Sequence, residues 1–254
     1  MLGLISYCRN RVFYGKKINF FCIIFFACMF LGPFSAFCAA VPGDLPEESA
    51  ADVPQKTSVP AGPPADGGSI FFGTIGEASN LIPYLTSDSA SHEVADLLYV
   101  APLRYNKDLQ PEPWAAESWS MEDEGRRMRF TLRKGILWED GQELTAEDVA
   151  FTCKLAADPA TGSPYAEDFL RIKELRVIDR YTFEVQYEHF FARAVSTWMN
   201  PILPRHILEG QNIRSTPFAR KPMGAGPYRL KSWEPGSRMV FEASPTYFAG
   251  KPHI

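Results

Sequence analysis

The sequence has 254 residues, of which 46% are hydrophobic and 22% are charged, so the chain can bury a sizeable core. The formal net charge is −4. All charged residues in the first 40 positions are basic, and the later positions carry 22 basic against 30 acidic residues. This acidic body argues against the basic face that nucleic-acid binding requires, and we expect no nucleic-acid partner.

The first 40 residues have the order of a secretory signal. Basic residues lie between positions 9 and 17, an uncharged apolar run follows at 18–31, and small residues precede position 41. The apolar run is shorter than the ~20 residues that a membrane-spanning helix needs. We expect cleavage after Ala40 and a periplasmic or otherwise extracytoplasmic protein. An uncleaved anchor remains open, as does a lipid on Cys38, although Phe37 stands where a lipoprotein signal needs a small residue.

Residues 41–68 are expected to form a disordered linker. The segment holds six prolines in 28 residues and contains no aromatic side chain. Such a composition cannot bury enough apolar surface to offset the entropy of ordering the chain. A spacer of this kind suits a protein held near a membrane, and a disordered mature N-terminus explains it equally well.

The folded part is expected to begin at position 69 and to mix helices with strands. Apolar residues alternate in the strand segments, and they recur every three or four positions in the helical ones. Thr145 is placed to cap a helix, with acidic residues in its first turn. This mixture predicts an α/β or α+β fold. In chain order we expect a buried strand at 69–74, a helix at 91–101, a strand at 127–133, a helix at 146–157, a strand at 181–187, a helix around 196–199, and two strands at 227–233 and 238–242.

Motifs for enzyme chemistry are incomplete or absent in the sequence. Residues 92–96 (HEVAD) hold one histidine of a zinc-protease helix, but Asp96 replaces the second, which favours a solvated polar helix face. Pro227 follows the glycines of residues 224–226 and removes a donor that a phosphate loop would use, so a tight backbone corner is expected. Cys153 is expected to be a buried packing residue. We therefore expect no catalytic residue, no metal site and no cofactor.

A series of short motifs resembles the family 5 bacterial extracellular solute-binding proteins, whose oligopeptide- and dipeptide-binding members are components of ABC importers. Ala225 and Phe248 depart mildly from the family pattern, in which threonine and tryptophan stand at these positions. The motifs lie at 113–119 (PWAAESW), 130–141 (FTLRKGILWEDG), 144–152 (LTAEDVAFT), 202–206 (ILPRH), 224–228 (GAGPY) and 245–252 (PTYFAGKP).

This resemblance implies the N-terminal lobe, at 69–254, of a two-lobed periplasmic binding protein whose second lobe is missing. It implies a monomer that binds oligopeptides between its lobes and delivers them to an ABC transporter permease in the inner membrane. A receptor for another solute of the same family, such as a nickel chelate or a sugar, remains an alternative. A hydrolase is a further alternative that no motif supports.

The resemblance also points to ligand-binding residues. Residues 158–166 (DPATGSPYA) are similar to a segment of the oligopeptide-binding members in which the tyrosine faces the peptide, which implies a ligand contact for Tyr165. A buried structural tyrosine is the alternative. The loop after residues 80–83 (NLIP) lines the cleft in those members, which implies Asp88 and Ser89. The carboxylate that pairs with the ligand's amino terminus belongs to the second lobe in those members, so no residue here inherits that role.

Overall fold

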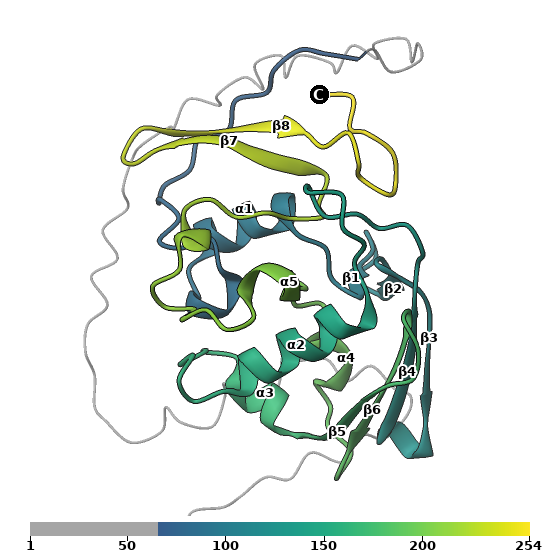
Figure 1. Cartoon of the computed structure of the whole chain (residues 1–254). Helices are drawn as coiled ribbons and strands as arrows, with labels where there is room; N and C mark the ends of the chain where they lie inside the picture. Colours follow the sequence, from purple (N-terminus) through teal and green to yellow (C-terminus); the bar gives the residue numbers. More distant parts are fainter. Residues whose placement is uncertain (1–65) are drawn as a thin grey trace, which may run out of the picture. The chain divides into compact units, whose positions relative to one another are not determined.

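The computed structural model describes residues 66–254 (Figure 1). The expected signal segment at 1–40 and most of the expected linker at 41–68 lie outside the described residues. In chain order the elements are the 3-10 turn η1 (Pro83–Leu85), α1 (Ser89–Leu98), β1 (Leu103–Tyr105), β2 (Pro111–Pro113), β3 (Ala116–Glu122), η2 (Asp123–Gly125), β4 (Arg127–Leu132), α2 (Ala146–Ala157), α3 (Ala166–Leu170), β5 (Ile172–Val177), β6 (Thr182–Tyr187), α4 (Ala194–Thr197), α5 (Arg205–Leu208), η3 (Pro217–Ala219), β7 (Tyr228–Glu234) and β8 (Arg238–Ala243).

The largest sheet has the strand order β3-β4-β6-β5, and every pairing in it is antiparallel. Residues of β4 alternate between buried and exposed, as the sequence predicts. Met128 and Phe130 are buried, while the flanking arginines are exposed. Phe130 lies opposite Phe183 on β6, and their rings stack with centroids 4.8 Å apart. Trp198 packs on both rings, which places the centre of the core against the inner face of this sheet.

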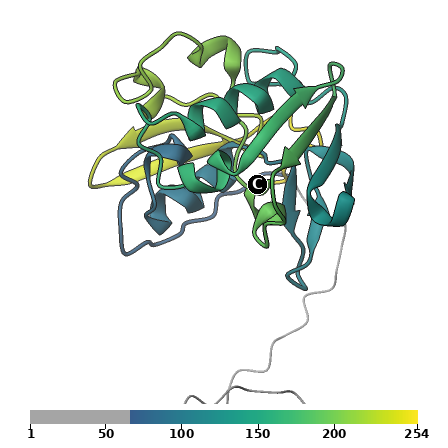
Figure 2. The same ribbon diagram turned by 90° about the horizontal axis from the view of Figure 1, so that it is seen from below.

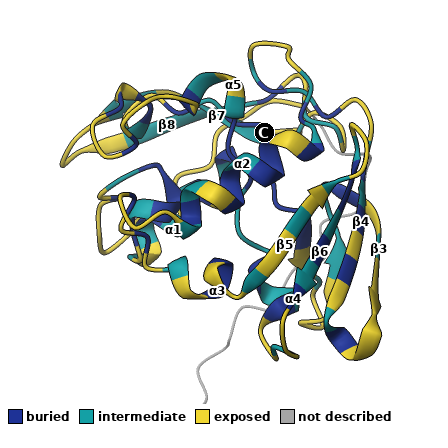
Figure 3. Cartoon of the chain, turned by 60° about the horizontal axis from the view of Figure 1, so that its bottom comes forward, coloured by how far each residue is buried: buried dark blue, intermediate teal, exposed yellow. Residues whose placement is uncertain are grey.

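Helices cover the inner face of the sheet. Helix α2 packs against β5, α3 and α5, while α1 packs against β7 of the separate β7–β8 hairpin. Figure 1 shows this succession from the hairpin through α1 and α2 to the four-stranded sheet, and Figure 2 shows the same elements from below. Figure 3 shows buried residues along α2 and alternating buried and exposed residues along β4, while β5 holds no buried residue. Helices and antiparallel strands together confirm the mixed α/β class.

Two local signals in the sequence explain where elements begin and turn. Helix α2 starts after Thr145 as expected, and the carboxylate of Asp148 accepts the Thr145 backbone N–H at 2.8 Å. The expected backbone corner is also confirmed at Gly224, where a Cβ atom would lie 1.7 Å from the backbone oxygen of Leu98. None of the helices within residues 66–254 is long and apolar enough to span a membrane.

The expected buried strand at residues 69–74 is wrong. This segment forms no strand, and Phe71 and Phe72 are 94% and 85% exposed. A strand needs a neighbour for its backbone hydrogen bonds, and residues 66–254 offer none to this segment. The residues just before the segment are tied to the C-terminal end of the chain, since the Gly67 N–H donates to the carbonyl of His253 at 2.7 Å.

Candidate functional site

The structure brings the three expected ligand-binding residues into one region, where the loop before α3 meets the start of α1. The connection is a hydrogen bond between the Tyr165 hydroxyl and Nε2 of His92, with the two atoms 2.6 Å apart. The two rings meet edge to face, with centroids 5.8 Å apart and an interplanar angle of 82°. Tyr165 is half-buried. The expectation of a ligand contact for Tyr165 stays a prediction, because the same contact with His92 also fits a structural role.

The loop that carries Tyr165 is fixed by its own short polar side chains. Asp158 ends α2 and accepts the Ala160 backbone N–H at 2.8 Å, while the Ser163 hydroxyl accepts the Tyr165 backbone N–H at 3.2 Å. The guanidinium of Arg214 donates to the carbonyl of Thr161 at 3.2 Å. These bonds hold the tyrosine in place without using its hydroxyl, which is left for His92 and for a ligand.

Asp88 is the N-cap of α1 rather than a free carboxylate. It accepts the backbone N–H of Ser91 at 2.8 Å, the Ser91 hydroxyl at 2.9 Å and the Ser79 hydroxyl at 2.6 Å, and it also accepts the hydroxyl of Thr86. These four bonds are shared unevenly, since the three hydroxyls donate to Oδ2 and only the Ser91 backbone N–H donates to Oδ1. Partial burial alone would raise the pKa of Asp88, but the hydrogen bonds from these donors hold that pKa well below its ordinary value.

Ser89 is the first residue of α1 and is exposed. Within residues 66–254 its hydroxyl makes no side-chain hydrogen bond, so it is available to a ligand. Burial, and then the negative charge of Asp88, raise the pKa of the Tyr165 hydroxyl above its ordinary value. The region therefore offers two uncharged hydroxyls beside a negatively charged carboxylate that already accepts four hydrogen bonds.

His92 belongs to this region, although the sequence favoured a solvated helix face for residues 92–96. That expectation is wrong for His92, because the imidazole is half-buried and bonded to Tyr165. The only sequence signal was a histidine one turn into a helix whose start was itself placed two residues late. Pairing with a residue 73 positions away leaves no local trace in the sequence.

Metal ligands and the single described thiol are the next possible sources of chemistry. Within residues 66–254 there is no group of three or more His, Cys, Asp or Glu side chains that could hold a metal ion. Cys153 is buried in α2 as expected, and burial raises the pKa of its thiol. A thiol with a raised pKa is a poor nucleophile, so Cys153 is a packing residue.

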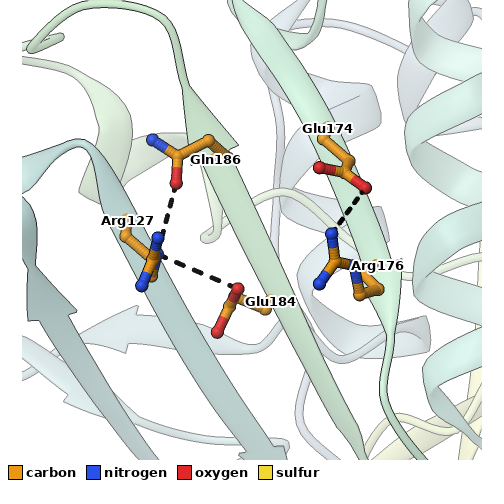
Figure 4. Close-up of a pocket in the computed structure, with 5 residues that line it drawn as sticks. All are labelled: Arg127, Glu174, Arg176, Glu184 and Gln186. Atoms are coloured by element: carbon orange, nitrogen blue, oxygen red, sulfur yellow. Dashed lines mark hydrogen bonds and ion pairs between the residues drawn. The ribbon is translucent and has the colours of Figure 1, made fainter.

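A polar pocket lies on the outer face of the four-stranded sheet (Figure 4). Arg127 donates to Gln186 at 3.2 Å and lies 3.9 Å from Glu184, while Arg176 pairs with Glu174 at 3.0 Å. Each charge in this pocket already has a partner on a neighbouring position of the sheet. The pocket resembles an ordinary solvated sheet face more than a binding site.

Comparison with known proteins supports the resemblance seen in the motifs. Residues 110–254 match the family model "Bacterial extracellular solute-binding proteins, family 5 Middle". The oligopeptide-binding protein AppA of Bacillus subtilis is 31% identical over 76% of this chain and 37% of its own length. Protein XP55 of Streptomyces lividans is 32% identical over 78% of this chain and 37% of its own length.

A solved structure agrees with these sequence relatives. The oligopeptide-binding protein AppA from Bacillus subtilis, in complex with a nonapeptide, superimposes with a TM-score of 0.71 and 28% identity. The match covers 75% of this chain and 39% of that structure. The chain thus spans between one third and two fifths of the length of the relatives it matches.

Proposed function

Because the chain belongs to the bacterial extracellular solute-binding proteins of family 5, we propose that it acts as an extracytoplasmic substrate-binding component of an ABC importer and that its substrates are peptides. The observation that carries the proposal is the match to an oligopeptide-binding protein at 31% identity over 76% of the chain. The proposed role is binding and delivery without chemical conversion.

In this proposal Tyr165 and Ser89 contact the ligand directly, and Asp88 acts indirectly as the N-cap of α1. A peptide presents many neutral main-chain groups, and hydroxyls can both donate to carbonyls and accept from amides. The carboxylate of Asp88 caps the first turn of α1, so Ser89 is presented at a fixed position. We assign residues 69–254 to one wall of the binding cleft, with the opposite wall supplied by the remainder of the family fold.

The proposed compartment follows from the signal-like residues 1–40 and the proline-rich residues 41–68. Export with cleavage after Ala40 leaves a mature chain that begins at Val41. N-terminal sequencing of protein recovered from the extracytoplasmic fraction tests this. An intact Met1 in the cytosol contradicts export, and a lipid-modified Cys38 would replace cleavage at Ala40 with anchoring.

Native mass spectrometry is the direct test of the ligand, and it is done on protein that carries both walls of the cleft, purified from that fraction. We expect a peptide that is released on denaturation, and we expect Tyr165→Phe to weaken rebinding of that peptide by about tenfold, the value of one hydrogen bond. Tyr181→Phe is the matched control, because the Tyr181 hydroxyl bonds to Glu143 away from the candidate site. A bound sugar or metal chelate would overturn the peptide assignment, and hydrolysis of added peptides would overturn the role as a receptor.

The importer partner and the oligomeric state follow from the same proposal. A monomer is expected in analytical ultracentrifugation, and stimulation of ATP hydrolysis is expected when the liganded protein is added to its permease in liposomes. A stable dimer contradicts the expected monomer. ATP hydrolysis that does not rise when the liganded protein is added contradicts the proposed importer partner.

A further inference from the structure

Arg214 is a cation that the structure fixes against the loop before α3. Its guanidinium Nη1 donates to the carbonyl of Thr161 at 3.2 Å, and its backbone N–H donates to the side-chain oxygen of Asn212 at 3.0 Å. Thr161 is only 2% exposed, so the accepting carbonyl belongs to an anchored part of this loop. The two bonds restrict a long side chain that would otherwise sample many rotamers. The guanidinium is therefore held on the same loop that carries Tyr165.

Gly162 makes room for this guanidinium. Its φ of 65° lies in the left-handed region that favours glycine. A Cβ atom at this position would lie only 2.7 Å from Nη1 of Arg214, so a larger residue would have to displace the guanidinium. The glycine and the arginine thus fit each other, and the loop and Arg214 form one unit.

No carboxylate compensates the charge of Arg214 within residues 66–254. The guanidinium is exposed, makes no ion pair there and uses one of its five N–H donors on the Thr161 carbonyl. Arg193 differs, because it pairs with the buried carboxylate of Asp168 in α3. An arginine stays charged at physiological pH and presents its donors as a planar fork that matches a carboxylate. A fixed, exposed and uncompensated arginine is therefore suited to bind an anionic group.

We propose that Arg214 is a specificity-determining residue of the candidate site and that it binds a carboxylate of the ligand. The inference rests on the proposed function for the peptide class, and it adds a charge requirement that the hydroxyls of Tyr165 and Ser89 do not impose. A peptide can present the carboxylate at its C-terminus or on an acidic side chain. Both sources offer the same chemistry to the guanidinium.

Calorimetry on protein that carries both walls of the cleft separates the two sources. The probes are trialanine with a free C-terminus, trialanine amide, and the amide of alanyl-glutamyl-alanine. We expect at least one of the two peptides with a carboxylate to bind about tenfold or more tightly than trialanine amide, the value of a hydrogen bond to a charged group. Tighter binding of trialanine assigns the C-terminus, and tighter binding of the glutamyl peptide assigns an acidic side chain. Equal binding of all three peptides overturns the inference.

Variants separate a role in binding from a role in holding the loop. Arg214→Gln removes the charge but keeps an N–H donor for the Thr161 carbonyl, so a residue that only held the loop would leave the preference unchanged. We expect the preference to disappear in Arg214→Gln and to survive in part in Arg214→Lys, which keeps the charge without the fork. Arg129→Gln is the matched control, because Arg129 is an exposed arginine of β4 that also makes no ion pair in the described part of the chain. A preference that survives in Arg214→Gln contradicts the proposed role.

The ligand found by native mass spectrometry separates a failure of this inference from a failure of the proposed function. If no peptide binds, but a non-peptide acid binds and its affinity falls in Arg214→Gln, the peptide assignment is wrong and the role of Arg214 stands. A ligand of any class that binds wild type and Arg214→Gln equally well shows that the role of Arg214 is wrong. Binding of neither a peptide nor another acid overturns both proposals.

Discussion

Replacement of Asp88 tests whether this residue is a structural cap or a free ligand-binding carboxylate. Asp88→Ala removes an N-cap and four accepted hydrogen bonds at once. Two of the donor residues, Thr86 and Ser91, are only 7% and 1% exposed, so water cannot fully replace the carboxylate for them. We expect a large loss of stability in the protein without ligand, which a residue that only touched ligand would not show.

The magnitude follows from these contacts. Loss of an N-cap costs about 1 kcal/mol, and each of the two buried hydroxyls left to find a new partner adds about 0.5–1.5 kcal/mol. The free energy of unfolding should therefore fall by about 2–4 kcal/mol in Asp88→Ala. Asp88→Asn keeps one acceptor oxygen in place but loses the charge, so we expect about half of that effect.

The pH dependence supplies a second check with a definite sign. The hydrogen bonds to Asp88 lower its pKa in the folded state below the value of about 3.9 in the unfolded chain. The stabilisation by the charged form is therefore fully present above about pH 4, and it is lost as the pH falls toward the lower folded-state pKa. The difference in stability between wild type and Asp88→Asn should shrink as the solution is acidified below about pH 4.

The assay is urea unfolding of the full chain, monitored by circular dichroism at several pH values. Glu93→Gln is the matched control, since Glu93 is an exposed acid of the same helix, and its effect should stay within about 0.5 kcal/mol. If Asp88→Asn is as stable as wild type at neutral pH, or if their difference does not change with pH, the cap explanation is refuted.

Three further predictions concern packing. Gly224→Ala should cost about 3 kcal/mol or more because its Cβ would meet backbone, whereas Gly73→Ala, which has open space, should be neutral in the same thermal melts. Cys153 should resist iodoacetamide in the native protein and react only in denaturant; modification mapped to Cys153 in native conditions would contradict its burial and raised thiol pKa. Replacing both Phe71 and Phe72 by serine should reduce aggregation at high concentration, measured by light scattering, because both rings are exposed to solvent. Unchanged aggregation would show that this segment does not cause it.

Several features of this protein could be predicted from the sequence alone because their causes are local. The alternation of Met128, Phe130 and Leu132 predicted a strand with one buried face, since side chains of a strand point to opposite sides in turn. Thr145 and Asp148 marked the start of α2 because a helix end needs acceptors for its free N–H groups. The order of the short motifs was sufficient to recognise the family.

The candidate site was only partly predictable. The resemblance pointed to Tyr165, Ser89 and Asp88, and the structure places all three in one region, yet it gives Asp88 a capping role that the sequence did not suggest. The expected strand at 69–74 also shows the limit of predicting structure from local sequence. Its composition suits a strand, but composition cannot supply the neighbour that a strand requires.

Only the tertiary structure decided that His92 belongs with Tyr165. The two residues are 73 positions apart, one on a helix and one on a loop. The helical spacing around His92 does not predict a contact with Tyr165, and the turn residues before Tyr165 do not predict one with His92. A sequence records the preferences of each segment for its own backbone conformation. The hydrogen bond between them forms only when packing brings the phenol oxygen and the imidazole nitrogen to 2.6 Å.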